Sequence, residues 1–169
     1  IVILYTILGG MWAITLTDLI QFGLIVIGIM FIMLPKSLSA AGGFSNLVNT
    51  LPKEYMNVTN IGWGTIIQYF FLYCLGAMVG QDIWQRFFTA KSVKVARAGG
   101  IGVGIFALVY SITCAVIGMC AKVVMPNLDN TQLAFGNFAK EILPSGILGI
   151  VLASVLAVLM STAAGTLLA

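Results

Sequence analysis

One acidic residue lies inside a long apolar stretch of this sequence. Asp18 is the only charged residue in MWAITLTDLIQFGLIVIGIMFIML, residues 11–34. A carboxylate at the centre of a membrane helix costs about 2.5–3.5 kcal/mol on insertion scales, so such residues usually serve an ion or a proton. Alternatively, Thr15, Thr17 and Asp18 could cap a helix at the cytoplasmic membrane surface. A helix beginning at Leu19 would be short for a bilayer before Pro35, which favours a coupling role for Asp18.

A second stretch, residues 63–86, combines an apolar span with glycines and a charged end: WGTIIQYFFLYCLGAMVGQDIWQR. Within it, Tyr69, Tyr73, Gly76 and Gly80 recur at helical spacing and share one face. Glycines on that face would let the backbone unwind and offer its polar groups to a ligand, which is tolerated at membrane depth only beside a cavity. The same pattern fits tight helix packing with tyrosines at an interface. Spacing leaves both interpretations open.

Two hydroxyl residues, Ser161 and Thr162, lie deep in the last apolar stretch. Each side chain could donate to the carbonyl one turn earlier, as Ser and Thr commonly do in such helices. Alternatively, the two hydroxyl oxygens and the carbonyl oxygen of Val158 could bind a small cation, because hard cations prefer oxygen ligands. Spacing alone does not separate these possibilities.

Composition excludes several classes of protein. Of the 169 residues, 60% are hydrophobic and only 8% are charged, whereas soluble domains carry about a quarter charged residues. We therefore predict an all-α integral membrane protein with several spans. No basic patch suits nucleic acid. The chain has no histidine, which excludes Ser-His and Cys-His catalysis, and no pair of acids has an acid–base spacing. We expect no enzymatic activity.

Charged residues and prolines divide the chain into spans and loops. The expected spans are residues 1–8 (the tail of one span), 11–34, 62–84, 98–121 and 144–169. The segment 86–97 carries four cations and no acid, which predicts a cytoplasmic loop by the positive-inside rule. Segments 35–61 and 122–143 would then be outer loops, on the extracellular or periplasmic side. Ser45, Leu47, Val48 and Leu51 could form one short surface helix there. Both ends enter apolar runs directly, so we expect a fragment of a larger protein.

Four glycines at positions 99, 100, 102 and 104 superficially match a nucleotide-binding loop. That loop requires a preceding strand and an acid about 20 residues later. Here a basic segment precedes the glycines, and Lys122 stands where the acid would be. Gly100 and Gly104 instead predict a small-residue face for close helix packing.

Four motifs occur in order along the chain: YTILGGMWA (5–13), TD-x-x-Q (17–21), WQRFFTAKS (84–92) and LPSGILGIVLASVLAVLMST (143–162). Together they resemble the sodium/solute symporter family and extend over nearly the whole chain. The resemblance implies the leucine-transporter fold, in which two inverted five-helix repeats surround a site at the membrane midplane. This chain would hold the end of core helix 4 and core helices 5 to 8. Core helix 1 would belong to the remainder of the protein and supply the other half of the site.

The resemblance also implies an ion site. The matching positions are Val158 through its carbonyl, and Ser161 and Thr162 through their hydroxyls, around one sodium ion. Some members bind a second sodium with the acid that matches Asp18 and two serines. Those serine positions are Ala164 and Gly165 here, so we expect one sodium per substrate.

The implied solute site lies on the glycine-containing span, at Tyr69, Tyr73, Gly76 and Ala77. Sugar carriers of the family place Asn, Tyr and Trp where this chain has Tyr73, Gly76 and Ala77, so a sugar is not expected. Aromatic rings would suit an apolar or cationic group, and exposed backbone amides would suit a small carboxylate or amino acid. Both remain open.

The implied function is sodium-coupled uptake of a small organic solute by alternating access across a lipid bilayer. The expected location is the inner (plasma) membrane of a bacterium. The alternative is a symporter-like sensory membrane domain of a signalling protein, which would be distinguished by a kinase-like region elsewhere in the protein.

Overall fold

The computed structural model describes residues 2–127 and 130–168, without the side chains of Leu4, Tyr5, Asp82 and Leu168. Every regular element in this part of the chain is a helix. In chain order the elements are α1 (Val2–Ile25), the π-helix η1 (Val26–Met33), α2 (Leu34–Ala40), α3 (Gly43–Thr50), the 3-10 turn η2 (Lys53–Met56), α4 (Trp63–Val79), α5 (Gln81–Phe88), α6 (Val93–Val124), the 3-10 turn η3 (Thr131–Leu133), α7 (Ala134–Ile142) and α8 (Ser145–Leu168). Residues 1 and 169 of the expected spans, and residues 128–129 of the expected outer loop, lie outside the described residues.

Three helical stretches are long and apolar enough to cross a bilayer: Thr6–Ala40, Val93–Val124 and Ser145–Leu167. The apolar helix α4 is shorter, with 17 residues. These helices confirm the predicted all-α membrane protein. The last of them begins directly after Pro144, whose carbonyl accepts from the Leu148 N–H at 2.9 Å.

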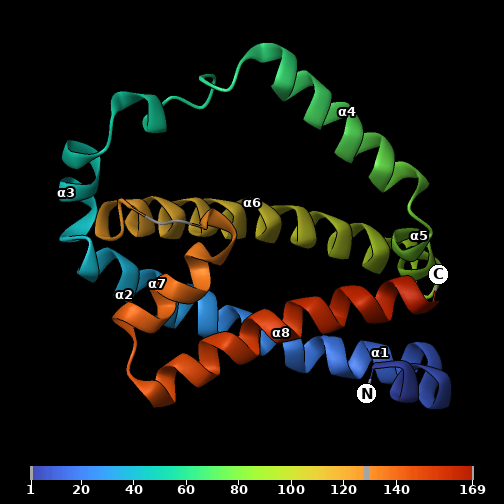
Figure 1. Cartoon of the computed structure of the whole chain (residues 1–169). Helices are drawn as coiled ribbons and strands as arrows, with labels where there is room; N and C mark the ends of the chain where they lie inside the picture. The colour runs from blue at the N-terminus through green and yellow to red at the C-terminus, as the bar shows by residue number, and fades with distance from the viewer. Residues whose placement is uncertain (1, 128–129, 169) are drawn as a thin grey trace.

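The helices form an open bundle. Figure 1 shows α1 and α8 side by side along most of their length, with α6 above them in this view and α4 standing apart. Helices α3 and α7 lie at one end of the bundle, and α5 lies at the other end with both chain termini. We refer to these as the α7 end and the α5 end.

Small residues allow α1 and α8 to approach closely. Ser154, Ala157 and Ala164 of α8 are buried and recur at helical spacing. The contact continues into η1, where a Cβ at Gly28 would collide with the Ser154 hydroxyl, so only glycine fits at that position. Ser154 Oγ donates to the Leu24 carbonyl oxygen at 2.7 Å. Close backbone approach and interhelical hydrogen bonds are the means by which membrane helices associate, since lipid offers no hydrophobic driving force between them.

Helix α1 is kinked at Gly10, whose φ of 53° and ψ of −146° are non-helical. Such a conformation is essentially open only to glycine. The sequence predicted the tail of one span before the Gly9-Gly10 pair, and the structure has helix on both sides of a kink at this point.

The chain does not leave the helical conformation at Pro35. The expected span ended at Leu34, whereas the structure continues without interruption to Ala40. The preceding segment Val26–Met33 is π-helical, and the Leu34 N–H donates to the carbonyl of Ile29, five residues earlier. Pro35 then lies in the first turn of α2, where a missing N–H is tolerated. The wider π turn therefore accommodates a proline that would otherwise end the helix.

The best-packed part of the chain lies at the α7 end. Met33, Leu47, Phe138 and Val151 are fully buried there. Leu47 belongs to α3, which confirms the predicted short helix in the segment 35–61, although Leu47 is buried rather than at the surface. Helix α7 was not predicted, although it occupies the expected outer loop 122–143. The signal was present in the sequence, because Phe135, Phe138, Ala139 and Ile142 follow the i, i+3, i+4, i+7 spacing of an amphipathic helix.

Candidate functional site

Asp18 lies where α1, α5 and α8 meet. Ser161 Oγ on α8 donates to Asp18 Oδ1 at 2.6 Å. Arg86 Nη2 on α5 lies 3.0 Å from Asp18 Oδ2. The Asp18 side chain is 16% exposed, whereas that of Arg86 is 52% exposed. Asp18 Oδ1 therefore accepts a hydrogen bond from a neutral hydroxyl, whereas Asp18 Oδ2 has a cation beside it but no hydrogen-bond donor among the described residues. The three residues join helices that are far apart in sequence. We call them the Asp18 cluster.

A cavity of about 250 Å³ adjoins the Asp18 cluster. Its lining includes Thr15, Asp18, Gln85, Arg86 and Gly165. Gly165 lies beside the arginine, and a Cβ at that position would be in ordinary van der Waals contact with Arg86 Nη2, at 3.5 Å. A water molecule occupies about 30 Å³ in the liquid, so the cavity can hold several waters or an ion with part of its hydration shell.

A break is present in the stretch 63–86, as one of the two interpretations of its glycines required, and it is confined to Gly80. Helix α4 ends at Val79 and α5 begins at Gln81, while the Gly80 N–H still donates to the Gly76 carbonyl at 2.8 Å. Gly80 has φ of −59° and ψ of 110°, a conformation that any residue can adopt. The break thus does not depend on the conformational freedom of glycine.

A side-chain hydrogen bond satisfies one backbone carbonyl group at the break. Trp84 Nε1–H donates to the Met78 carbonyl oxygen at 2.7 Å, one of the acceptors that the end of α4 leaves without a helical donor. Helix α5 thereby folds back toward α4 and contacts α8. This geometry carries Arg86 to the carboxylate of Asp18.

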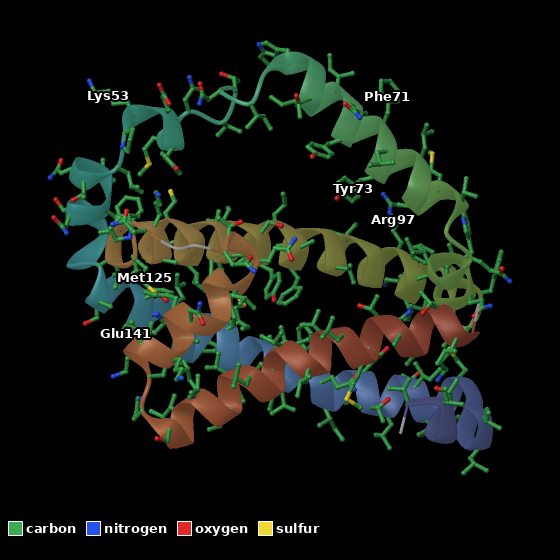
Figure 2. The ribbon with its side chains drawn as sticks, in the orientation of Figure 1. Lys53, Phe71, Tyr73, Arg97, Met125 and Glu141 are labelled. Carbon is green, nitrogen blue, oxygen red and sulfur yellow. The ribbon has the colours of Figure 1, made fainter. Side chains whose placement is uncertain are left out.

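The four predicted solute positions lie on α4 and are not brought to the Asp18 cluster. Tyr69 is 49% exposed and Tyr73 is 70% exposed, and their rings lie 6.1 Å apart. Gly76 and Ala77 are exposed as well. Figure 2 shows Tyr73 on the side of α4 that faces α6, with Phe71 on the opposite side. The four residues share one helix but have no enclosing partner among the described residues.

The three predicted sodium ligands have different partners. Thr162 Oγ1 donates to the Val158 carbonyl oxygen at 3.0 Å, the local hydrogen bond that was the alternative in the sequence. Ser161 instead directs its hydroxyl to Asp18 across the helix interface. The Val158 and Thr162 oxygens thus lie side by side on α8, with Ser161 adjacent. Sodium binding by the three residues stays a prediction.

Two further polar residues of α1 are buried. Gln21 is 8% exposed and Thr6 is 7% exposed, and Gln21 Oε1 and Thr6 Oγ1 have no hydrogen-bond partner among the described residues. An unsatisfied buried acceptor costs about 1–3 kcal/mol, so these atoms would gain from water or an ion. Gln21 follows Asp18 by three residues and shares its helix face, a spacing visible in the sequence. The pairing of Asp18 with Arg86 had no such local signal.

Comparison with known proteins gives a consistent result. A model of the sodium:solute symporter family matches residues 1–169. The chain is 27% identical to a sodium/pantothenate symporter of Haemophilus influenzae and 29% identical to that of Escherichia coli, in each case over 94% of the chain and 34% of the relative. It is 25% identical to the mouse sodium/myo-inositol cotransporter 2, over 94% of the chain and 30% of that protein. The chain thus spans about a third of the length of these relatives. No solved structure matches it.

Proposed function

Since this chain belongs to the sodium:solute symporter family, we propose that the protein couples uptake of a small organic solute to the inward movement of sodium. The observation that carries this proposal is the Asp18 cluster, a largely buried membrane carboxylate that contacts the hydroxyl of Ser161 at 2.6 Å. Sodium drives uptake if it binds the solute-competent state more tightly than the other states. No enzymatic step is part of this function.

The sodium ion is proposed to bind the Val158 carbonyl and the hydroxyl oxygens of Ser161 and Thr162. A hydroxyl has one hydrogen and two lone pairs. Because the Ser161 hydrogen is directed to Asp18 Oδ1, the lone pairs of this oxygen are free for a cation. Thr162 keeps its lone pairs in the same way while it donates to Val158. Asp18 would therefore act on the ion through the orientation of Ser161 and through its charge, which is the proposed coupling role.

A stoichiometry of one sodium per solute is supported by the position of Arg86. The positions of the second-sodium serines are Ala164 and Gly165, and the Arg86 guanidinium lies between Gly165 and Asp18. A cation already paired with the carboxylate at 3.0 Å would repel a second sodium there.

The Arg86–Asp18 ion pair also suggests how access to the site alternates. It ties α5 to α1 beside a cavity of about 250 Å³, at the end of the bundle that the positive-inside rule assigns to the cytoplasm. Movement of α5 about Gly80 would separate the pair and widen the cavity. Sodium near Asp18 would compete with Arg86 for the carboxylate, which couples ion binding to this movement.

The solute is proposed to bind beside Tyr69, Tyr73, Gly76 and Ala77 of α4, together with other segments of the protein. Its class remains open. The named relatives are carriers of pantothenate and myo-inositol by their names, so the comparisons do not support the expected exclusion of sugars and polyols. All these relatives are named as transporters, and nothing favours the alternative of a sensory domain. A bacterial inner membrane is proposed as the location, in line with the two bacterial relatives.

The test is uptake by the intact protein reconstituted into liposomes. Radiolabelled pantothenate, myo-inositol, glucose and proline are offered with an inward sodium gradient, with potassium as the matched control. Uptake of at least one solute should require the sodium gradient, and one sodium should move per solute. Solute uptake of equal rate in potassium would overturn sodium coupling, and a ratio near two would overturn the single-ion site.

A further inference from the structure

A second cavity lies between α5 and the first half of α6, and Arg86 of the Asp18 cluster is one of its lining residues. It measures about 680 Å³, within the range of about 300–1,000 Å³ that is usual for small-molecule sites. Its walls are mainly apolar, with Ile83 and Phe87 from α5 and Val95, Val103 and Gly104 from α6. We call this cavity the α5–α6 groove.

The α5–α6 groove has the length of one membrane leaflet. Its α6 wall extends from Val95 to Gly104, which is about 15 Å of helix. That is half of the roughly 30 Å hydrocarbon thickness of a bilayer. The groove begins beside the last charged residue of this part of α6, Arg97, and no further charge occurs before Lys122. One end therefore lies at the expected membrane surface and the other lies in the hydrocarbon.

Cations surround the surface end of the groove. Lys91, Lys94 and Arg97 are exposed, and each is the immediate sequence neighbour of a residue that lines the groove. Figure 2 shows Arg97 at the α5 end of α6. The sequence has no acid from residue 83 to residue 128. Among the side chains that the structure describes, the recorded ion pair is Arg86–Asp18, and it leaves these three cations without an acidic partner.

We propose that the α5–α6 groove binds an anionic phospholipid of the leaflet in which the Lys91–Arg97 segment lies. An acyl chain fills the apolar channel, and the phosphodiester contacts the three cations. Basic residues at the membrane end of a helix attract anionic headgroups, and an apolar groove suits a hydrocarbon chain. A zwitterionic lipid offers the same chain without net negative charge, so charge complementarity favours the anionic lipid.

The charge requirement is tested by native mass spectrometry of the intact protein with phosphatidylglycerol and phosphatidylcholine as probes. The triple variant Lys91→Gln, Lys94→Gln, Arg97→Gln should bind phosphatidylglycerol at least about tenfold more weakly, because three surface cations are lost, with little change for phosphatidylcholine. The matched control is Lys36→Gln, Lys53→Gln, Lys140→Gln, which removes the same charge elsewhere and should keep binding within about twofold of the unaltered protein.

The groove itself is tested by two glycine variants on α6. Gly104 lines the groove and Gly102 does not, and a Cβ at either position would meet no atom within 4 Å. Gly104→Leu should fill the channel and reduce bound phosphatidylglycerol, whereas Gly102→Leu should not. The proposal is overturned if the unaltered protein binds phosphatidylglycerol and phosphatidylcholine equally. It is also overturned if the control triple variant loses as much binding as the variant of Lys91, Lys94 and Arg97, or if Gly104→Leu and Gly102→Leu have equal effects. Binding of neither lipid would show that another segment of the protein covers the groove.

Discussion

Ser161 on α8 and Asp18 on α1, 143 positions apart in sequence, are joined by a hydrogen bond of 2.6 Å. The next residue, Thr162, makes only a local hydrogen bond to Val158. Two neighbouring hydroxyls with the same predicted role in sodium binding thus differ in their contribution to the fold. This difference allows ion binding and stability to be measured separately.

Ser161→Ala should affect both stability and sodium dependence, because it removes the donor to a largely buried carboxylate oxygen. We expect a loss of about 1–3 kcal/mol in the free energy of unfolding. Thr162→Ala should change stability by less than about 0.5 kcal/mol, since its hydroxyl is exposed. Both variants should raise the sodium concentration for half-maximal uptake. Thermal unfolding in detergent and sodium titration of uptake check the two effects, and unchanged sodium dependence in both variants would exclude these residues as ligands.

Arg86→Gln should raise the apparent affinity for sodium and slow turnover. The arginine is half exposed, so the ion pair contributes at most about 1 kcal/mol to stability. Its loss leaves the Asp18 carboxylate without a cationic partner, which favours retention of sodium. We expect the half-saturating sodium concentration to fall by about two- to fivefold, in line with that interaction energy.

The control for this variant is Arg97→Gln, which removes an equal charge from α6 without a recorded contact to Asp18. Sodium titration and steady-state uptake rates distinguish the two. If both substitutions shift the sodium dependence equally, the effect is one of net charge and the proposed competition at Asp18 is wrong.

Gly28→Ala should weaken the contact between η1 and α8. The added Cβ would collide with Ser154 Oγ, and overpacking of this kind typically costs about 1–3 kcal/mol. Gly23→Ala is the matched control, because a Cβ at Gly23 meets no atom within 4 Å and alanine is preferred in helices by up to about 1 kcal/mol. The unfolding temperature in detergent should therefore fall for Gly28→Ala and rise for Gly23→Ala. Equal shifts of the two variants would show that the close contact between Gly28 and Ser154 does not determine the stability.

The sequence was sufficient for properties that depend on local composition. Apolar composition predicted an all-α membrane protein, and a broken helix was one of the two interpretations of the glycine-containing stretch after Trp63. The prediction that the helix ends at Leu34 was wrong. Proline usually ends a helix, but the π turn before Pro35 changes the hydrogen-bond register and the helix continues. Helix α7 was missed because its charged residues, Lys140 and Glu141, made the segment resemble a loop and masked the periodicity around Phe138.

The candidate site could be predicted only in part. Asp18, Ser161 and Thr162 were identified individually, because a charged or hydroxyl residue within an apolar run can be recognised from the sequence without knowledge of its spatial neighbours. The contact between Asp18 and Arg86 was not, because their separation of 68 positions has no helical periodicity and depends on the direction that α5 takes after Gly80. The solute positions on α4 require neighbouring helices that the described residues do not supply.

Phe138→Ala tests whether the α7 end supports the fold independently of the ion site. Phe138 is completely buried in the cluster formed with Met33, Leu47 and Val151. Its truncation should cost about 3–5 kcal/mol, and the unfolding temperature in detergent should fall accordingly. Phe44→Ala is the control, because this side chain is 59% exposed and its loss should be nearly neutral. Since Phe138 does not contact the Asp18 cluster, the protein that remains folded should keep its sodium dependence. A changed sodium dependence in Phe138→Ala would instead mean that packing at the α7 end is coupled to the ion site through α8.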